Sequence, residues 1–125
     1  MDMIQDYLDL VVYQKSYSTA LFVHEMTKAF PKEEIYGITG QIRRAVLSIP
    51  LNIAEGYGKR ESVAEFKRFL AMSKGSCNEV KVLLQFSKDL GYIDDDRCKK
   101  LIADYNEIGK MLHGLMTNWK QYGKG

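Results

Sequence analysis

The sequence predicts an all-α protein, an antiparallel up-down-up-down four-helix bundle. In four long segments apolar residues recur every three or four positions, the spacing of one helix face. Only short connections separate these segments, and short connections favour antiparallel neighbours. No segment alternates as strands do. We therefore expect residues 1–125 to form a single four-helix domain, with residues 123–125 as a frayed tail.

The first helix is expected over residues 8–30, ended by Pro31. The four-three spacing predicts its inward face, which consists of Val12, Ser16, Thr19, Val23, Met26 and Phe30. A second aromatic and apolar set exceeds what one bundle face needs: Tyr13, Tyr17, Leu21 and Phe22. Apolar patches of this kind mark contact surfaces, so this set predicts self-association.

The second helix, expected over residues 36–57, has an apolar face and a polar row. The apolar face consists of Ile42, Val46, Ile49 and Ile53. The polar row consists of Arg44, Ser48, Asn52 and Glu55. Ser and Asn are mediocre helix formers, and Pro50 deprives the Val46 carbonyl of its helical donor, at about 3 kcal/mol in a helix interior. Two interpretations stay open: a kinked core helix, or a bent helix whose polar row is buried against another helix or subunit.

The third helix is expected to open with a capping box of Ser62 and Glu65 and to close at Gly91. Its seam is Phe66, Leu70, Ser73, Cys77, Val80, Leu84 and Ser87. Gly75, in the middle, marks either a close helix crossing or a tolerated surface glycine. The fourth helix follows the acidic residues 94–96, which suit a helix N-terminus. Its inward residues are Leu101, Tyr105, Ile108, Leu112, Leu115 and Trp119.

Basic residues are concentrated in the middle of the chain, although the whole sequence carries a formal net charge of only +2. Residues 43–88 contain nine Lys or Arg and four Asp or Glu. Five of these cations are spaced by seven residues and form a stripe: Arg60, Lys67, Lys74, Lys81 and Lys88. Such a stripe suits the phosphates of RNA or DNA. The other interpretation is the ordinary lysine-rich solvated face of a bundle helix.

The sequence lacks the patterns of the common enzyme and metal sites. No Glu is followed three residues later by His, as a di-iron bundle requires, and His24 and His113 have no partners at metal spacing. No phosphate loop, nucleophile elbow or dinucleotide fingerprint occurs. We therefore expect a non-enzymatic protein without metal or cofactor. We expect Cys77 to be a small core residue rather than a nucleophile.

The compartment is expected to be the cytoplasm. Cys77 and Cys98 are the only cysteines, and no signal peptide is recognisable, so a reducing environment is the natural setting. No apolar run approaches the roughly 18 residues that would span a bilayer. We therefore expect no contact with a membrane.

Two stretches carry a resemblance to a known family. They read ITGQIRRAVLSIPLNIAEGYGKR and EFKRFLAMSKGSCNEVKVLLQFSKDLGYI, with the SIPxNIAEG core at residues 48–56. They resemble the small bacterial four-helix-bundle proteins known as intervening-sequence proteins of the large-subunit ribosomal RNA. The accessory protein of diversity-generating retroelements is similar. The resemblance implies a homo-pentameric barrel, and the retroelement member binds nucleic acid and a reverse transcriptase.

Together these observations predict a non-catalytic, homo-oligomeric binding or scaffolding protein. Its expected partners are further copies of itself, most simply in a pentamer, and RNA, DNA or a nucleic-acid enzyme bound through the basic stripe. The alternative is a purely structural homo-oligomer, or a small-ligand-binding bundle whose site is the polar row on the second helix.

Overall fold

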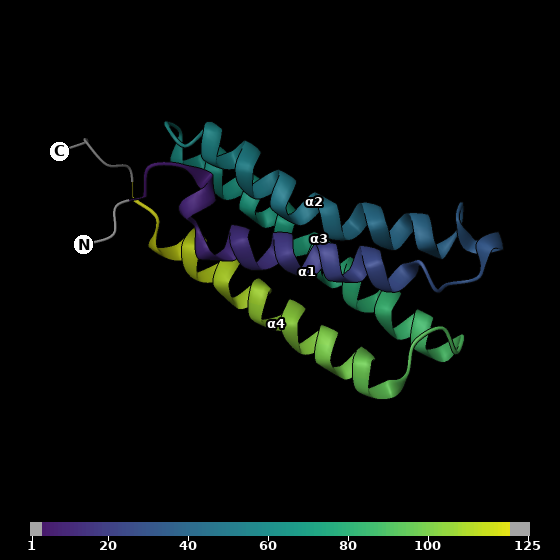
Figure 1. The fold of residues 1–125 in the computed structure, drawn as a ribbon. Coiled ribbons are helices and arrows are strands. Elements are labelled where there is room, and N and C mark those ends of the chain that lie inside the picture. The colour runs from purple at the N-terminus through teal and green to yellow at the C-terminus, as the bar shows by residue number, and fades with distance from the viewer. Residues whose placement is uncertain (1–3, 121–125) are drawn as a thin grey trace.

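The computed structural model describes residues 4–120, which contain four α-helices and no strand. The helices are α1 (Val11–Thr27), α2 (Ile38–Gly58), α3 (Val63–Asp89) and α4 (Asp95–Asn118). Two short 3₁₀ helices precede α1 and α2, η1 (Tyr7–Asp9) and η2 (Lys32–Glu34). Figure 1 shows that the chain reverses direction at each connection between successive helices. The all-α bundle predicted from the sequence is confirmed. The predicted tail, residues 123–125, lies outside the described residues.

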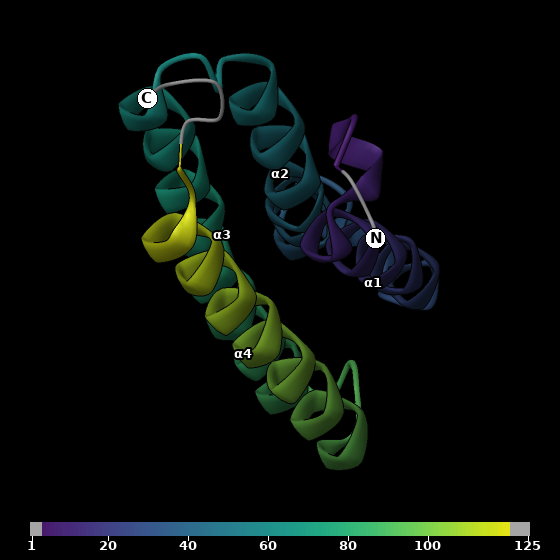
Figure 2. The same cartoon turned by 90° about the vertical axis from the view of Figure 1, so that its left-hand side faces the viewer.

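The four helices do not pack equally against one another. α3 packs most extensively against α2 and then against α4, whereas α1 packs on α2 and makes only a small contact with α4. Figure 2 shows α1 beside α2 and α4 beside α3. Contacts on both sides make α3 the helix that joins the two halves of the bundle.

The predicted inward faces form the core. Every residue assigned to the seams of the first three helices is buried, from Val12 in α1 to Ser87 in α3. In α4, Leu101, Tyr105, Ile108 and Leu112 are buried. Leu115 and, just after the helix, Trp119 are partly buried and pack against the core. The four-three periodicity therefore identified the core correctly, because a helix can bury only one stripe of its surface in a bundle.

The ends of the first helix differ from the prediction. α1 begins at Val11 rather than at residue 8, because Leu10 has an extended backbone (φ −75°, ψ 121°) and is buried. The residues before it form η1, capped by the Asp6 side chain. α1 ends at Thr27 rather than Phe30, and the predicted turn at residues 32–34 is η2, so that α2 begins at Ile38.

The predicted helix caps are mostly present. The Ser62 hydroxyl accepts a hydrogen bond from the Glu65 backbone N–H (3.2 Å), but the Glu65 carboxylate pairs with Arg68 and the second half of the capping box is not formed. The Asp94 carboxylate accepts from the Arg97 N–H at 2.7 Å. Gly91 closes α3 in the left-handed region (φ 81°), where glycine carries no steric penalty.

Gly75 and Gly56 differ in the space that surrounds them. A Cβ atom built on Gly75 meets nothing within 4 Å, so Gly75 is a tolerated surface glycine. A Cβ atom on Gly56 would lie 2.6 Å from the Phe69 Cβ and 3.1 Å from the Phe66 Cδ1. The close helix crossing is therefore at the end of α2.

Candidate functional site

The middle of the basic stripe borders a groove between α3 and α4. Lys74 and Lys81 are half-buried, and both contact α4. The Lys74 Nζ lies 3.2 Å from the His113 Nδ1, and the Lys81 Nζ donates to the Asn106 side-chain oxygen at 2.8 Å. These lysines therefore lie on the side of α3 that borders α4, where their side chains are partly covered.

The ends of the stripe have other partners. Lys88 lies 3.6 Å from Asp89 and 3.8 Å from Asp95, so its charge is matched by carboxylates. Arg60 is exposed before α3, with its guanidinium 4.0 Å from the centre of the Tyr57 ring. Lys67 is half-buried on α3. The structure thus separates the five predicted residues into a central pair and three residues outside the groove.

The groove contains a cavity of about 460 Å³, here called the α3–α4 cavity. Its basic lining comes from both helices, Lys74 and Lys81 from α3 and Lys110 from α4, with the His113 imidazole beside them. The remaining lining residues are Cys77, Asn78, Tyr105, Asn106 and Gly109. No carboxylate lines the cavity, and none of its three lysines forms an ion pair with a described residue.

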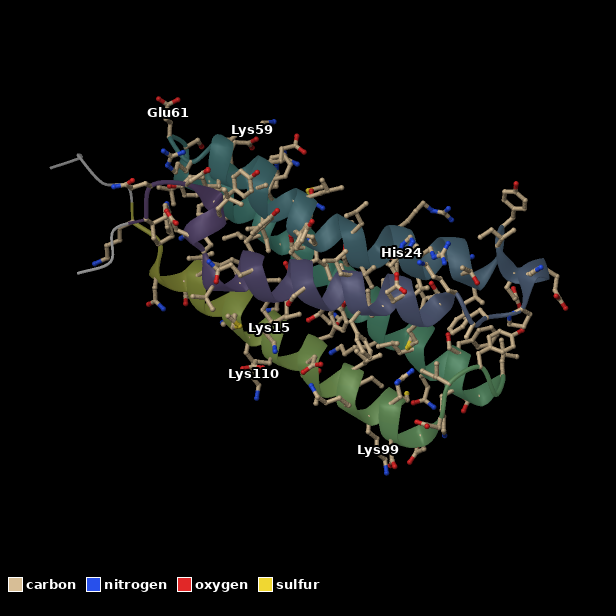
Figure 3. The ribbon with its side chains drawn as sticks, in the orientation of Figure 1. Lys15, His24, Lys59, Glu61, Lys99 and Lys110 are labelled. Atoms are coloured by element: carbon tan, nitrogen blue, oxygen red, sulfur yellow. The ribbon has the colours of Figure 1, made fainter. Side chains whose placement is uncertain are left out.

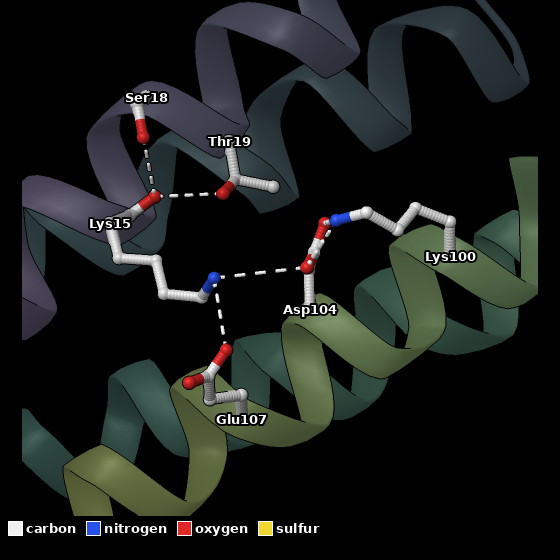
Figure 4. Close-up of polar contacts among 6 residues, drawn as sticks. All are labelled: Lys15, Ser18, Thr19, Lys100, Asp104 and Glu107. Carbon is white, nitrogen blue, oxygen red and sulfur yellow. Dashed lines mark hydrogen bonds and ion pairs between the residues drawn. The ribbon is translucent and has the colours of Figure 1, made fainter.

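The nearby carboxylates of α4 face α1 instead. Figure 4 shows the Lys15 ammonium group between Glu107 (3.0 Å) and Asp104 (3.7 Å). The hydrogen bond to Glu107 is the main cause that raises the pKa of Lys15. Asp104 also pairs with Lys100 at 2.8 Å. Because Asp104 and Glu107 pair with lysines on the α1 side of α4, they do not neutralise the lysines that line the α3–α4 cavity.

Two buried ionisable groups lie at the inner wall of the cavity. Tyr105 is fully buried and its hydroxyl has no hydrogen-bond partner among residues 4–120, and burial raises the pKa of that hydroxyl. Burial also raises the pKa of the Cys77 thiol to about 11, although Lys81 lowers it in part. Cys77 is therefore a protonated thiol at neutral pH, which agrees with a core residue and not with a nucleophile.

Metal-binding clusters and membrane-spanning helices are not found in residues 4–120. No group of three or more His, Cys, Asp or Glu side chains in this part of the chain is arranged to hold a metal ion. His24 and His113 are both exposed. None of the four helices combines the length and the apolar character needed to cross a bilayer.

The polar row of α2 does not converge on one site. The Ser48 hydroxyl contacts the Ala45 carbonyl (2.7 Å) and the Ser76 hydroxyl (2.8 Å), and the Asn52 amide donates to the Ser48 carbonyl (2.9 Å). Arg44 and Glu55 are exposed, and Glu55 lies 3.7 Å from Lys59. Ser48 and Asn52 thus bond to carbonyls of their own helix, and Ser48 also contacts α3 through Ser76.

A second, more apolar groove lies between α1 and α2. Its cavity of about 370 Å³ is lined in part by the exposed side chains of Tyr17, Leu21 and Leu47. His24, Arg43 and Arg44 lie at its polar edge. The sequence pattern identified Tyr17 and Leu21 but missed Leu47. Of the other predicted contact residues, Tyr13 stacks on Tyr17 with 5.9 Å between ring centres, and Phe22 lies 5.4 Å from the Arg97 guanidinium.

The sequence reasoning also missed the contribution of α4 to the basic groove. Lys110 and His113 are three residues apart, so they share one face of that helix. That spacing could have indicated a basic face on α4, but periodicity alone does not show which helix lies opposite this face.

Comparison with known proteins supplies the family. The sequence model of the 23S rRNA-intervening sequence protein family matches residues 8–114. The chain belongs to this family. The structure is similar to the crystal structure of a protein of unknown function from the S23 ribosomal protein family of Bacteroides thetaiotaomicron, with a TM-score of 0.78 and 27% sequence identity. That match covers 86% of this chain and 96% of the other. The comparison with curated proteins gives no match.

Membership of the 23S rRNA-intervening sequence protein family agrees with the resemblance found in the sequence. The matched region includes all of α1, α2 and α3 and most of α4, up to Gly114. It therefore contains every residue of the α3–α4 cavity and of the polar row.

Proposed function

We propose that this protein is a non-catalytic, homo-oligomeric protein that binds RNA or DNA through the lysines of α3. The observation that carries the proposal is the convergence of Lys74, Lys81, Lys110 and His113 on one cavity without a carboxylate. Phosphate contacts by lysine supply most of the affinity of sequence-tolerant nucleic-acid binding. The family description, which refers to 23S rRNA, supports the same class of partner.

Self-association would multiply these contacts. The apolar groove of α1 and α2, with Tyr17, Leu21 and Leu47 exposed, is a surface that a second copy would cover. In a closed ring, and most simply in the pentamer expected from the family resemblance, each cavity would be repeated around the axis. Weak phosphate contacts then act together and raise the apparent affinity.

Salt-dependent binding tests the nucleic-acid part of the proposal. Labelled single- and double-stranded RNA and DNA would be titrated with the protein from about 50 to 300 mM salt and followed by fluorescence anisotropy. Each phosphate contact contributes about −0.7 to −0.9 to the slope of log affinity against log salt. We expect binding at low salt that weakens steeply as salt rises.

Two variants with the same change in charge distinguish binding through the basic stripe from attraction by the overall charge of the protein. The Lys67→Glu, Lys74→Glu, Lys81→Glu variant changes the basic stripe, and the Lys28→Glu, Lys32→Glu, Lys99→Glu variant makes the same charge change elsewhere. We expect the first to lose binding and the second to retain most of it. Absence of binding by the wild-type protein at about 50 mM salt would overturn the proposal and favour the structural or small-ligand alternative.

Light scattering tests the assembly. We expect a closed oligomer at micromolar concentration and a smaller species for the Leu21→Glu, Leu47→Glu variant, because both side chains are exposed in the apolar groove. A wild-type monomer at that concentration would contradict the homo-oligomeric part of the proposal.

A further inference from the structure

The charges around the α3–α4 cavity are arranged as in an anion site. Lys74 and Lys81 are two helical turns apart on α3, so their ammonium groups approach the cavity from different points along it. Lys110 approaches from α4. A cleft lined by charges of one sign concentrates the potential and attracts ions of the opposite sign. The site therefore favours a ligand with concentrated negative charge.

Hydrogen-bonding capacity indicates the same chemistry. Each lysine ammonium group has three N–H donors and no acceptor. Lys74 and Lys81 direct one contact each to His113 and Asn106, and Lys110 has no hydrogen bond or ion pair with a described residue. The Asn78 amide adds donors at the wall. A ligand rich in acceptor oxygens complements this set.

The volume allows more than a single small ion. About 460 Å³ falls within the roughly 300–1,000 Å³ range of ligand pockets. A phosphate group would therefore fit together with part of the molecule that carries it.

We propose that the α3–α4 cavity binds one phosphate group through Lys74, Lys81 and Lys110. This inference rests on the proposed function where the phosphate belongs to a nucleic-acid backbone. The same chemistry would also hold the phosphate of a small phosphorylated molecule. The cavity is thus a discrete site, distinct from the diffuse attraction of a lysine-rich surface.

Glycines of α4 offer a matched pair of variants. A Cβ atom meets nothing within 4 Å at either Gly109 or Gly114, so both positions accept a side chain. Gly109 lines the cavity and Gly114 does not. Gly109→Asp therefore places a carboxylate at the cavity, and Gly114→Asp makes the same charge change on the same helix outside it.

Lysines of α4 offer a second pair. Lys110 and Lys99 are both exposed, and Figure 3 shows both side chains projecting from α4. Lys110 lines the cavity, whereas Lys99 is paired with Asp95 at 3.0 Å. Lys110→Gln thus removes one positive charge at the cavity, and Lys99→Gln removes one positive charge outside it. Gly109→Ala serves as a folding control that leaves the cavity charge unchanged.

The experiment uses two probes, a labelled single-stranded RNA and inorganic pyrophosphate at constant ionic strength. Anisotropy measures RNA affinity, and calorimetry measures pyrophosphate binding. We expect Gly109→Asp to weaken RNA binding about tenfold or more, with Lys110→Gln in the same direction, while Gly114→Asp, Lys99→Gln and Gly109→Ala change it less than about twofold. Pyrophosphate should compete with RNA, and circular dichroism should show unchanged helix content.

The outcomes distinguish the two proposals. If RNA binds and the cavity variants behave like their controls, the phosphate cavity is overturned while nucleic-acid binding stands. If RNA does not bind but pyrophosphate binds to the wild type and not to Gly109→Asp, the cavity is supported for a small phosphorylated ligand and the proposed function fails. If neither probe binds, both proposals fail.

Discussion

The two contacts of α3 are built in different ways. Towards α2, Gly56 lets the helices approach closely, and the buried Ser73 hydroxyl donates to the Ile49 carbonyl at 2.9 Å. Towards α4, half-buried lysines border a cavity of about 460 Å³. The α2–α3 contact is close and depends on small residues, whereas the α3–α4 contact leaves a cavity and contains charged side chains. We therefore expect substitutions at the α2–α3 contact to change mainly the stability of the fold, whereas the α3–α4 contact is the one for which we propose a binding role.

The largest effect is expected at Gly56, where the close contact has no room for a side chain. Gly56→Ala would force the Phe69 Cβ and the Phe66 ring away from a methyl group. Overpacking of this kind costs about 1–3 kcal/mol of unfolding free energy. Gly58→Ala is the control, because a Cβ atom there meets nothing within 4 Å. Urea denaturation would measure both, and equal stabilities would contradict the close crossing.

A pH effect is expected next, from the wall of the α3–α4 cavity. The pKa of the Cys77 thiol rises from 9.0 to about 11 on folding, so the folded state holds this proton more tightly than the unfolded state. The unfolding free energy should therefore fall as pH increases between about 9 and 11, by on the order of 2 kcal/mol. Denaturation of the wild type and Cys77→Ala across this range measures it. A slope that is the same in both proteins would exclude the thiol as its source.

A smaller effect is expected at the buried hydrogen bond between α3 and α2. Ser73→Ala removes the donor to the Ile49 carbonyl, and a typical hydrogen bond contributes about 1 kcal/mol to stability. Ser18→Ala is the matched control, because its hydroxyl bonds to the Lys15 carbonyl on the exposed side of α1. Thermal unfolding should show a lower midpoint for Ser73→Ala alone. A midpoint unchanged from the wild type would mean that the bond adds little to this contact.

The smallest effect is expected at Glu55, at the exposed end of the polar row. Its carboxylate lies 3.7 Å from Lys59, and both side chains are about half exposed. Exposed ion pairs contribute about 0–1 kcal/mol, so Glu55→Ala should change monomer stability by no more than about 0.5 kcal/mol. Light scattering of the same variant tests the other interpretation of the row. Loss of the oligomer without loss of monomer stability would place Glu55 at a subunit contact.

Features that depend on one helix were predictable from the sequence, and features that depend on a neighbouring helix were not. The repeating positions of Ile42, Phe66 and Leu101 identified buried faces, because burial follows the helix period whatever lies opposite. The capping roles of Ser62 and Asp94 were also predictable, since a cap depends on residues within one turn. Gly56 and Gly75 could not be ranked in the same way, because the space around a glycine depends on a neighbouring helix.

The sequence by itself determined the four helices, their inward faces and the spacing of the lysines on α3, because these depend on short-range periodicity and local hydrogen bonds. Only the tertiary structure decided that Lys74 and Lys81 line one cavity together with Lys110 and His113. It also decided that Asp104 and Glu107 form ion pairs with Lys15. The physical reason is the register of α4 against its neighbours. A shift of one residue rotates each side chain by about 100° around the helix and would change which charges meet.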